Sequence, residues 1–424
     1  MSTRLTRRAW LRGSAAITAG AALPSCNPSS RGVPLWFSYG GKNREALLAL
    51  VKAFNTEYPD AHLEPVFQGD YFELLAKLRT ALHADRAPAI THVVAEVIPY
   101  LAKAGVLEPL DELAPVVKSS DLVPALTQAG AFSGPGATDA TYGLPFNRST
   151  PIAYLNGAVL DELGLAPPQT WDELVTFAEA ASRGSGEDRR YGFACPIDWW
   201  FWVALLLQAG GEIADASGAI TLGGEAGVEA LSLWQSLVYE RNVMRPPAGR
   251  DYNAWQVVNQ DFISGRAAMI WTSTAFVRYL EENAKFRVVA APLPRKQRFG
   301  MPTGGTMFVV PKGGSARDRE VASLFLAFMA RASSSNEFAT KTGYIPITKS
   351  GIATLEADGY YARLPNDRVA VDQLEHARPW PWHAELFRVQ REIVQPRLEG
   401  AVLAREDARG ALDAARRAIT EDDG

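Results

Sequence analysis

The sequence predicts an α/β fold, in which a largely parallel sheet is covered by helices, and a chain large enough for two or more domains or one large two-lobed body. The length of 424 residues supports the second part of this prediction. Short apolar runs typical of strands alternate with segments whose apolar residues recur at helical spacing, which supports the first. The composition, 47% hydrophobic and 21% charged, is that of an ordinary globular protein.

The first half of the chain shows this alternation most clearly. Gly40 and Gly41 end the first strand, and Pro59 stops the first helix. Asp70 followed by Glu73 is a capping box, which predicts that a helix begins there. The expected strands are 33–37, 62–67 and 89–95, and the expected helices are 43–58, 70–82 and 99–104.

The alternation continues to the C-terminus. Thr170 is a predicted N-cap, and no internal repeat or low-complexity tract interrupts the pattern. The expected helices are 170–183, 225–242, 318–343 and most of the chain from about residue 372, and the expected strands are 191–195, 267–273, 286–294 and 304–312.

The stretch PFNRSTPIAYLN (145–156) places four hydrogen-bonding side chains, residues 147–150, between two strand-like runs. Taken by itself, this pattern fits a solvated turn that caps itself through Asn or Ser side chains. It also fits polar groups directed into a binding site. The residues alone leave both interpretations open.

The N-terminal segment predicts export. Arg7 and Arg8 precede a short stretch of small and apolar residues, which is typical of a twin-arginine signal peptide. Leu23 to Cys26 resembles a lipoprotein cleavage box, so Cys26 is the predicted lipidation site; the alternative is an ordinary signal peptide with an incidental cysteine. Cys195 then has no disulfide partner and is expected to be a buried free thiol.

Several classes of function lack their sequence signals. The net charge of −4 disfavours nucleic-acid binding, and no phosphate loop, dinucleotide fingerprint or GxSxG motif is present. The five histidines show no metal-ligand spacing, and carboxylates cannot be paired for glycoside cleavage from sequence alone. We therefore expect no enzyme activity, no metal and no cofactor.

Several motifs carry a resemblance to a known family. In order along the chain they are FNTEYPD, GDYFE, APAI, PFNRSTPIAYLN, TWDEL, PTGG and KTGYIPITKS. The chain resembles the periplasmic solute-binding proteins of ABC importers, and more narrowly the group that binds glycerol 3-phosphate and glycerophosphodiesters. TWDEL and FNTEYPD are common to many such proteins, whereas FNRSTPIAYLN and KTGYIPITKS are more specific. The resemblance implies a type II periplasmic binding protein fold, with two lobes joined by hinge strands.

The resemblance also implies a set of ligand contacts. Tyr71, Ser149, Ser273, Gly305, Tyr344 and Arg391 match contact positions of the family, with Arg391 expected to hold the phosphate. One position departs, because the glutamate expected to take the glycerol hydroxyls aligns with Ala95, and Glu96 is the next residue. Trp36 and Trp200 are placed at the cleft by the same resemblance, although most of the eleven tryptophans are expected in the core.

These expectations define an exported, lipid-anchored, monomeric protein of the periplasm or cell envelope. It captures a glycerophosphate-type ligand by hinge closure and delivers it to an ABC permease and its ATPase. The alternatives are a di- or oligosaccharide-binding protein and, from the enzyme class, a glycerophosphodiester hydrolase. The expected divisions are a signal peptide (1–26), a linker (27–32), lobe 1 (33–150 and 275–325) and lobe 2 (151–274 and 326–424).

Overall fold

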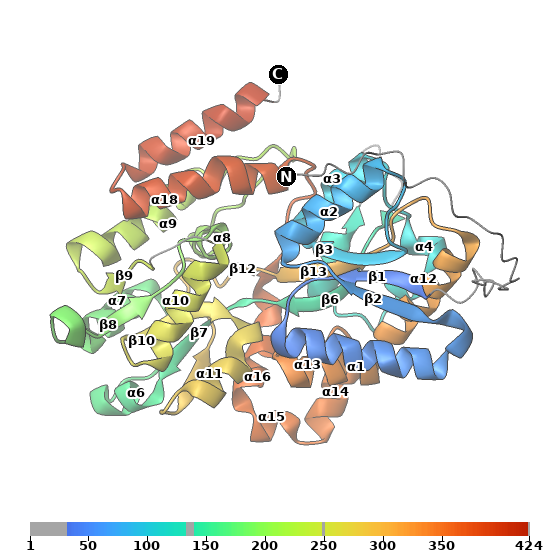
Figure 1. The fold of residues 1–424 in the computed structure, drawn as a ribbon. Coiled ribbons are helices and arrows are strands. Elements are labelled where there is room, and N and C mark those ends of the chain that lie inside the picture. The colour runs from blue at the N-terminus through green and yellow to red at the C-terminus, as the bar shows by residue number, and fades with distance from the viewer. Residues whose placement is uncertain (1–31, 133–139, 248–250, 423–424) are drawn as a thin grey trace, which may run out of the picture. The chain divides into compact units, whose positions relative to one another are not determined.

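Two five-stranded sheets organise residues 33–424, which form one unit of the computed structural model (Figure 1). The described residues are 32–132, 140–247 and 251–422. We call the first sheet and the helices packed on it lobe 1, and the second sheet and its helices lobe 2. The predicted signal peptide, Cys26 and nearly all of the linker lie outside the described residues.

The sheet of lobe 1 has the strand order β2-β1-β3-β13-β6. Its strands are β1 (Val33–Phe37), β2 (Leu63–Phe67), β3 (Ile90–Val94), β6 (Leu144–Ser149) and β13 (Gly304–Val309). β1 pairs in parallel with β2 and β3, whereas β13 is antiparallel to both of its neighbours. Four strands therefore run one way, as a largely parallel sheet predicts.

The sheet of lobe 2 repeats this plan with the order β11-β7-β10-β8-β9. Its strands are β7 (Pro151–Asn156), β8 (Tyr191–Ala194), β9 (Met244–Arg245), β10 (Ala267–Ser273) and β11 (Val288–Ala291). β7 alone is antiparallel to its neighbours, while β10 and β9 pair in parallel with β8. Two small sheets, β4 (Ala131–Phe132) with β5 (Ala140–Thr141) and β12 (Met301–Pro302) with β14 (Ala377–Arg378), lie beside these.

Helices account for most of the remaining chain. They are α1 (Gly41–Glu57), α2 (Tyr71–His83), α3 (Ile98–Lys103), α4 (Leu110–Leu113), α5 (Pro124–Thr127), α6 (Gly157–Leu163), α7 (Trp171–Ala181), α8 (Trp199–Gln208), α9 (Glu225–Gln235), α10 (Asp251–Ile263), α11 (Val277–Asn283), α12 (Ala316–Met329), α13 (Ala332–Thr342), α14 (Lys349–Ala357), α15 (Tyr360–Arg363), α16 (Pro365–Asp372), α17 (Leu386–Arg388), α18 (Gln395–Leu403) and α19 (Ala408–Asp422). Within the described ranges, every helix is too short or too polar to cross a membrane.

The predicted helix starts are confirmed by their caps. The Asp70 carboxylate accepts the N–H groups of Phe72 and Glu73, both at 2.8 Å, and Glu73 in turn accepts the Asp70 N–H at 3.0 Å. Two predicted helices are shorter than expected. The 225–242 helix gives way to a π-helical turn after Gln235, and the 318–343 segment breaks into α12 and α13.

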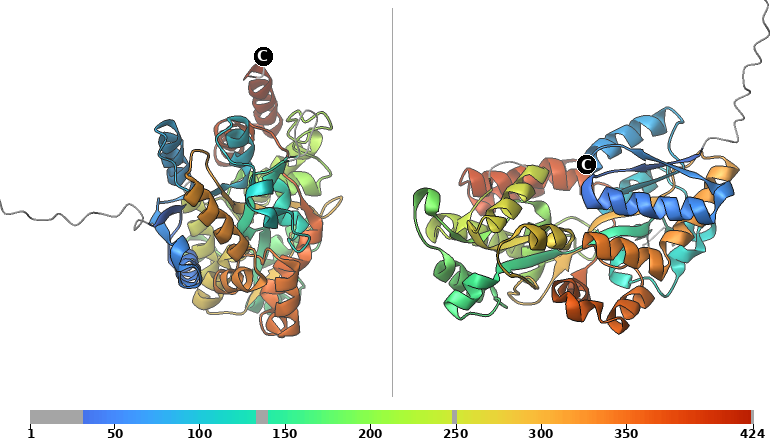
Figure 2. Two further views of the ribbon diagram at one scale, coloured as in Figure 1. Left: turned by 90° about the vertical axis from the view of Figure 1, so that its right-hand side faces the viewer. Right: turned by 60° about the horizontal axis from the view of Figure 1, so that its bottom comes forward.

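Apolar residues of the sheets and helices form the cores. In lobe 1, one face of the sheet packs against α1, α12 and α13, and the other against α2 and α3. α1 and α13 lie side by side although some 270 residues separate them in sequence (Figures 1 and 2). In lobe 2, α7, α8, α9, α18 and α19 cover one face and α10 and α11 the other.

The chain passes between the lobes at Thr150, between β11 and β13, and after residue 376. The two sheets and their helices divide the chain differently from the predicted lobes in two places. Residues 277–291 belong to lobe 2, because α11 and β11 pack on and pair with its sheet, and no crossing occurs at 273–275. Buried residues of the 326–347 segment join the core of lobe 1 instead of lobe 2, whereas α16 contacts both cores, Ala370 packing in lobe 1 and Val369 against lobe 2. Both differences arise from pairings between segments far apart in sequence.

Candidate functional site

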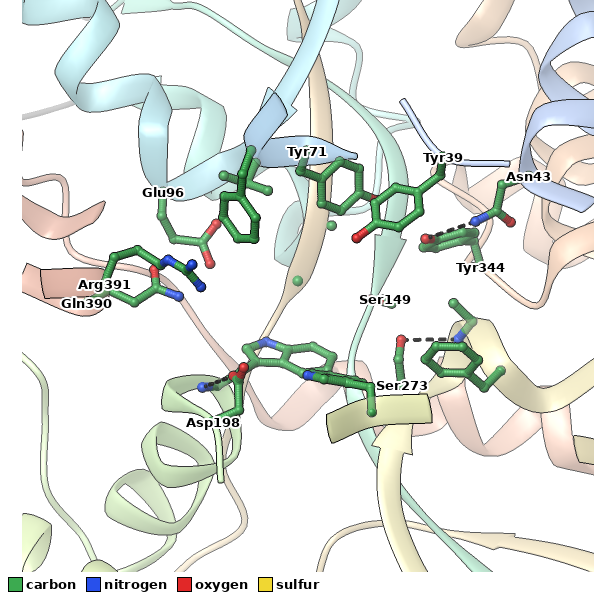
Figure 3. Close-up of a pocket in the computed structure, with 18 residues that line it drawn as sticks. Tyr39, Asn43, Tyr71, Glu96, Ser149, Asp198, Ser273, Tyr344, Gln390 and Arg391 are labelled. Atoms are coloured by element: carbon green, nitrogen blue, oxygen red, sulfur yellow. Dashed lines mark hydrogen bonds between the residues drawn. The ribbon is translucent and has the colours of Figure 1, made fainter. Parts of the chain in front are cut away.

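A pocket of about 240 Å³ collects side chains from both sheets, at the ends of their strands and at the crossings (Figure 3). It is lined by Tyr39, Asn43, Tyr71, Phe72, Val94, Glu96, Ser149, Asp198, Trp200, Trp255, Ser273, Ala275, Phe276, Gly304, Gly305, Tyr344, Gln390 and Arg391. These residues are far apart in the sequence, so the fold alone assembles the site.

The structure brings eight of the nine sequence-predicted ligand residues into this pocket. They are Tyr71, Glu96, Ser149, Trp200, Ser273, Gly305, Tyr344 and Arg391. Trp36 is not part of the lining. It lies on β1, partly buried, and packs against the hydrophobic cluster on the α2–α3 side of the sheet. We therefore assign Trp36 to the core of lobe 1.

The sequence left open whether Glu96 takes the place of the glutamate that aligns with Ala95. β3 ends at Val94, and the next three residues form a single 3₁₀ turn. In this turn Ala95 faces the core, with 1% of its surface exposed, whereas Glu96 lines the pocket. Glu96 therefore occupies the pocket in place of the residue at 95.

The Glu96 carboxyl group has an unusual environment. Glu96 is only 8% exposed, and this burial raises the pKa of its carboxyl group to about 7. The Arg148 guanidinium acts in the opposite direction, because it favours the charged form of the carboxyl group. Asp198 raises the pKa further, since a second negative charge in the pocket is unfavourable. Near neutral pH this carboxyl group can therefore act as a hydrogen-bond donor or as an acceptor.

Residues 147–150, which raised the question of turn or site, belong to β6 and its end. Ser149 lines the pocket, and Asn147 donates to the hydroxyl of Tyr71 at 2.6 Å. Thr150 sits at the crossing, where its carbonyl accepts the Thr274 N–H at 3.1 Å and its hydroxyl accepts from Gln373 at 2.5 Å. All four residues are buried, so a solvated turn is excluded.

Arg148 is a fully buried cation directly behind the pocket. Its guanidinium donates to the Gly305 carbonyl at 3.0 Å and to the Thr303 hydroxyl at 2.6 Å, both neutral groups. Burial lowers its pKa to about 10, which leaves it charged at neutral pH. A positive charge therefore lies beneath the Gly305 side of the pocket.

Glycine is required at 305. Its φ of +87° is in the left-handed region, and a Cβ there would lie 1.9 Å from the Asn147 carbonyl oxygen. The register of β13 on β6 shifts between Gly305 and Met307, which marks a bulge. The adjacent Gly304 leaves room for Trp200, because a Cβ would lie 2.6 Å from that ring. The bulge thus brings backbone and indole close together at the pocket.

Arg391 reaches the pocket from a π-helical turn, Val389–Val394. Its guanidinium lies over the Phe72 ring of lobe 1, 4.1 Å from the ring centre. This cation–π contact holds the guanidinium group at the wall of the pocket. In Figure 3, Arg391 and Gln390 lie on the same side of the pocket as Glu96.

Aromatic rings form the lobe 2 wall. Trp200 and Trp255 stack with centroids 5.5 Å apart, and Phe276 continues the wall 6.2 Å from Trp255. Asp198 caps α8 by accepting the Trp200 N–H at 2.8 Å, which fixes the start of the helix that carries Trp200. Trp255 and Phe276 were missed from sequence because each resembles an ordinary core residue.

Tyr39 is another lining residue that sequence reasoning missed. It has a positive φ of 69°, unusual for a residue with a side chain, and its ring meets Tyr71 edge-on at 4.2 Å. Its position two residues after the end of β1 was an available signal, since ligands of open α/β sheets bind beyond the carboxyl ends of strands. Among the described residues, no group of three or more His, Cys, Asp or Glu side chains could hold a metal.

Comparison with known proteins identifies the family. The model of the bacterial extracellular solute-binding protein family matches residues 49–360, well over half of the chain. The chain belongs to this family. Its members are solute-binding proteins, which agrees with a pocket between two sheets and with the fold predicted from sequence.

Individual relatives cover nearly the whole chain. This solute-binding protein is 24% identical over 431 residues to the sn-glycerol-3-phosphate-binding periplasmic protein UgpB of Pectobacterium atrosepticum, covering 96% of this chain and 94% of the relative. The structure of UgpB from Mycobacterium tuberculosis in complex with glycerophosphocholine is similar, with a TM-score of 0.80, 25% identity and coverage of 92% and 98%. The acarbose receptor GacH of Streptomyces glaucescens has the same fold, with a TM-score of 0.79, 21% identity and coverage of 92% and 98%. The predicted type II binding-protein fold is thereby confirmed.

Proposed function

We propose that this protein is the ligand-binding component of an ABC importer and that it captures glycerol 3-phosphate or a glycerophosphodiester such as glycerophosphocholine. The observation that carries the proposal is that one pocket holds Arg391, two serines, three tyrosines and the backbone at Gly305. A phosphate that loses water in a cleft needs this combination of positive charge and neutral donors. The buried Arg148 adds a second positive charge behind it.

The other groups that line the pocket are aromatic or acidic, and they favour a diester with a cationic headgroup. Trp200, Trp255 and Phe276 offer aromatic faces, and Glu96 and Asp198 offer carboxyl groups. Aromatic faces attract quaternary ammonium groups through cation–π interaction. A zwitterion with a phosphate at one end and choline at the other is complementary to both sets of groups.

A second candidate is a di- or oligosaccharide, because tryptophan faces also stack on sugar rings. The Trp200–Trp255 pair is the specific observation in its favour. Delivery to a permease and ATPase, periplasmic location and anchoring through Cys26 are parts of the same proposal. Cys26 precedes the described residues, so its lipidation stays a prediction from the sequence.

Isothermal titration calorimetry with glycerol 3-phosphate, glycerophosphocholine and maltose tests the ligand class. Arg391→Ala should weaken binding of the phosphate compounds by about 2–5 kcal/mol, and Arg391→Lys by less, because a lysine keeps the charge and loses the fork. Arg388→Ala is the matched control, since Arg388 pairs with Glu385 and is not part of the pocket lining. Equal affinity of Arg391→Ala and wild type would reject the phosphate assignment and favour a neutral sugar.

A further inference from the structure

Arg148 of β6 is a buried cation whose hydrogen-bond partners are all neutral. The residue is 0% exposed. Its guanidinium donates to the Gly305 carbonyl and to the Thr303 hydroxyl, and its Nε has no hydrogen-bond partner within the described ranges. No carboxylate in the described part of the chain forms an ion pair with it. A buried charge without a paired counter-charge is unfavourable, so the ligand-free protein maintains this arrangement at a cost in stability.

Another buried arginine of the same chain shows the more usual arrangement. Arg190 of lobe 2 is 8% exposed and donates to the Ala181 carbonyl at 2.8 Å, but it also pairs with the Glu162 carboxylate at 3.3 Å. Buried charged side chains are normally paired in this way. Both arginines therefore hold a backbone carbonyl, and they differ in that Arg148 lacks a carboxylate partner.

The charge of Arg148 acts on the pocket from behind the β13 bulge. Gly305, whose carbonyl holds the guanidinium, lines the pocket, and so do Glu96 and Tyr71, which act on Arg148 through space. Tyr71 stays neutral, because burial raises its pKa well above the usual value. Glu96 is only partly ionised near neutral pH, because burial raises its pKa to about 7. The positive charge is therefore balanced only in part when no ligand is bound.

We infer that Arg148 is a specificity-determining residue, a buried cation whose missing counter-charge is supplied by the anionic group of the ligand. The inference rests on the proposed function, in which that group is a phosphate. Arg148 acts without touching the phosphate, because charges separated by protein interact over several ångströms more strongly than charges separated by water. It thereby adds to the positive charge of Arg391 at the pocket wall.

Two ligands that share a glycerophosphoryl group distinguish this role from a structural one. Glycerol 3-phosphate is mostly a dianion at about pH 7. The phosphodiester of glycerophosphocholine carries one negative charge, and its choline group carries a positive charge. An electrostatic contribution from Arg148 should therefore be larger for glycerol 3-phosphate. A residue that only holds the bulge in shape would affect both ligands by the same factor.

Arg148→Gln, titrated with both ligands in a calorimeter, is the test, because glutamine keeps N–H donors for the Gly305 carbonyl and removes the charge. We expect the affinity for glycerol 3-phosphate to fall roughly 10- to 100-fold. The loss for glycerophosphocholine should be smaller by a factor of at least about five. Equal factors for the two ligands, including no change in either, would overturn the inference.

Arg190→Gln is the matched control. It removes a buried arginine that also holds a backbone carbonyl but lies outside the pocket lining, so the ratio of the two affinities should stay at the wild-type value. A cooperative urea transition is the check on folding for each variant. Arg148→Met, which fills the same space with an apolar chain, replaces Arg148→Gln if glutamine does not give a cooperative transition.

A ligand-free measurement distinguishes failure of this inference from failure of the proposed function. The ¹³Cδ resonance of Glu96, assigned by its loss in Glu96→Gln, reports the pKa of this carboxyl group. Arg148 favours its charged form and Asp198 opposes it, so removing the Arg148 charge alone should raise the pKa by roughly one pH unit. An unchanged pKa would overturn the inference whatever the ligand is, because the charge would then not act inside the pocket. A wild type that binds maltose but neither phosphate compound rejects the proposed function, and with it the phosphate as the counter-charge, even where the pKa of Glu96 rises.

Discussion

Neighbouring residues at the end of β6 make different contacts, because successive side chains of a strand point to opposite faces. Asn147 and Ser149 face the pocket side, while Arg148 reaches the Gly305 carbonyl and Thr303. Side chains two apart share a face of a strand, so one short stretch can supply both the pocket and its support. A solvated, self-capping turn would make none of these contacts, which accounts for four polar residues in a row.

The buried Glu96 carboxyl group leads to a prediction on pH and stability. Its folded-state pKa of about 7 exceeds the ordinary value of 4.5, so between these values the folded state binds more protons than the unfolded state. Stability of the ligand-free protein should therefore fall as pH rises through this window. Glu96→Gln removes the cost of the charge, and at about pH 8 it should stabilise the protein by up to about 3 kcal/mol.

Urea unfolding of wild type and Glu96→Gln at several pH values is the measurement. The difference in unfolding free energy should shrink toward zero near about pH 4, where the carboxyl group is neutral in both states. Glu112→Gln, at an exposed position, is the control. A difference that does not vary with pH would mean that Glu96 titrates normally.

At the scale of elements, the β13 bulge ties the sheet of lobe 1 to the pocket. It sets Gly305 opposite Arg148 of β6, and the Asn147 carbonyl lies where a side chain at 305 would go. The bulge places the Gly305 backbone on the pocket lining while the Arg148 guanidinium holds the Gly305 carbonyl from behind. Strand pairing and ligand contact are therefore coupled at this point.

Gly305→Ala should damage both stability and binding. Backbone strain at positive φ contributes about 1–3 kcal/mol, and the clash with the Asn147 carbonyl adds to it. Gly313→Ala is a close control, because Gly313 has a φ of +93° with no atom within 4 Å of the added Cβ. Chemical denaturation and ligand titration of both variants should show a larger loss at 305. Equal losses would mean that the bulge relaxes without cost.

At the scale of the whole binding unit, lobe 1 and lobe 2 share the pocket and meet on both of its sides. Arg391 of lobe 2 stacks on Phe72 of lobe 1, and Lys42 of α1 forms an ion pair with Glu282 of α11. The exposed ion pair contributes little by itself. A ligand that bridges the lobes adds contacts to both, so binding should favour their closure about the crossings.

Small-angle scattering tests this closure. The radius of gyration should decrease when glycerophosphocholine saturates the protein, because the lobes approach each other. Arg391→Ala, measured at the same ligand concentration, should show a smaller change in proportion to its lower occupancy. An unchanged radius at confirmed saturation would indicate a preformed, rigid pocket.

The sequence by itself determined the local elements and the choice of chemistry. Local signals can be recognised without the fold, because they depend only on residues a few positions apart. Examples are the apolar periodicity, the Asp70–Glu73 capping box and the glycines at strand ends. Motif resemblance supplied eight residues that the structure places in one pocket. Only the tertiary structure determines which other residues lie beside these eight in the pocket. Trp36 and Trp255 are both partly buried against the same hydrophobic cluster, yet only Trp255 lines the pocket.

The same limit explains the lobe boundaries and the contacts of Asn147. β11 pairs with β7 across more than 130 residues, and the Asn147 amide is oriented by Thr306 and contacts Tyr71, each far away in sequence. The pairing register of the strands and the orientation of the amide depend on contacts between residues that are distant in sequence. The packing of the whole sheet determines these contacts. Local sequence therefore specifies the elements and the available donors, while long-range contacts decide where each element belongs and which way each donor points.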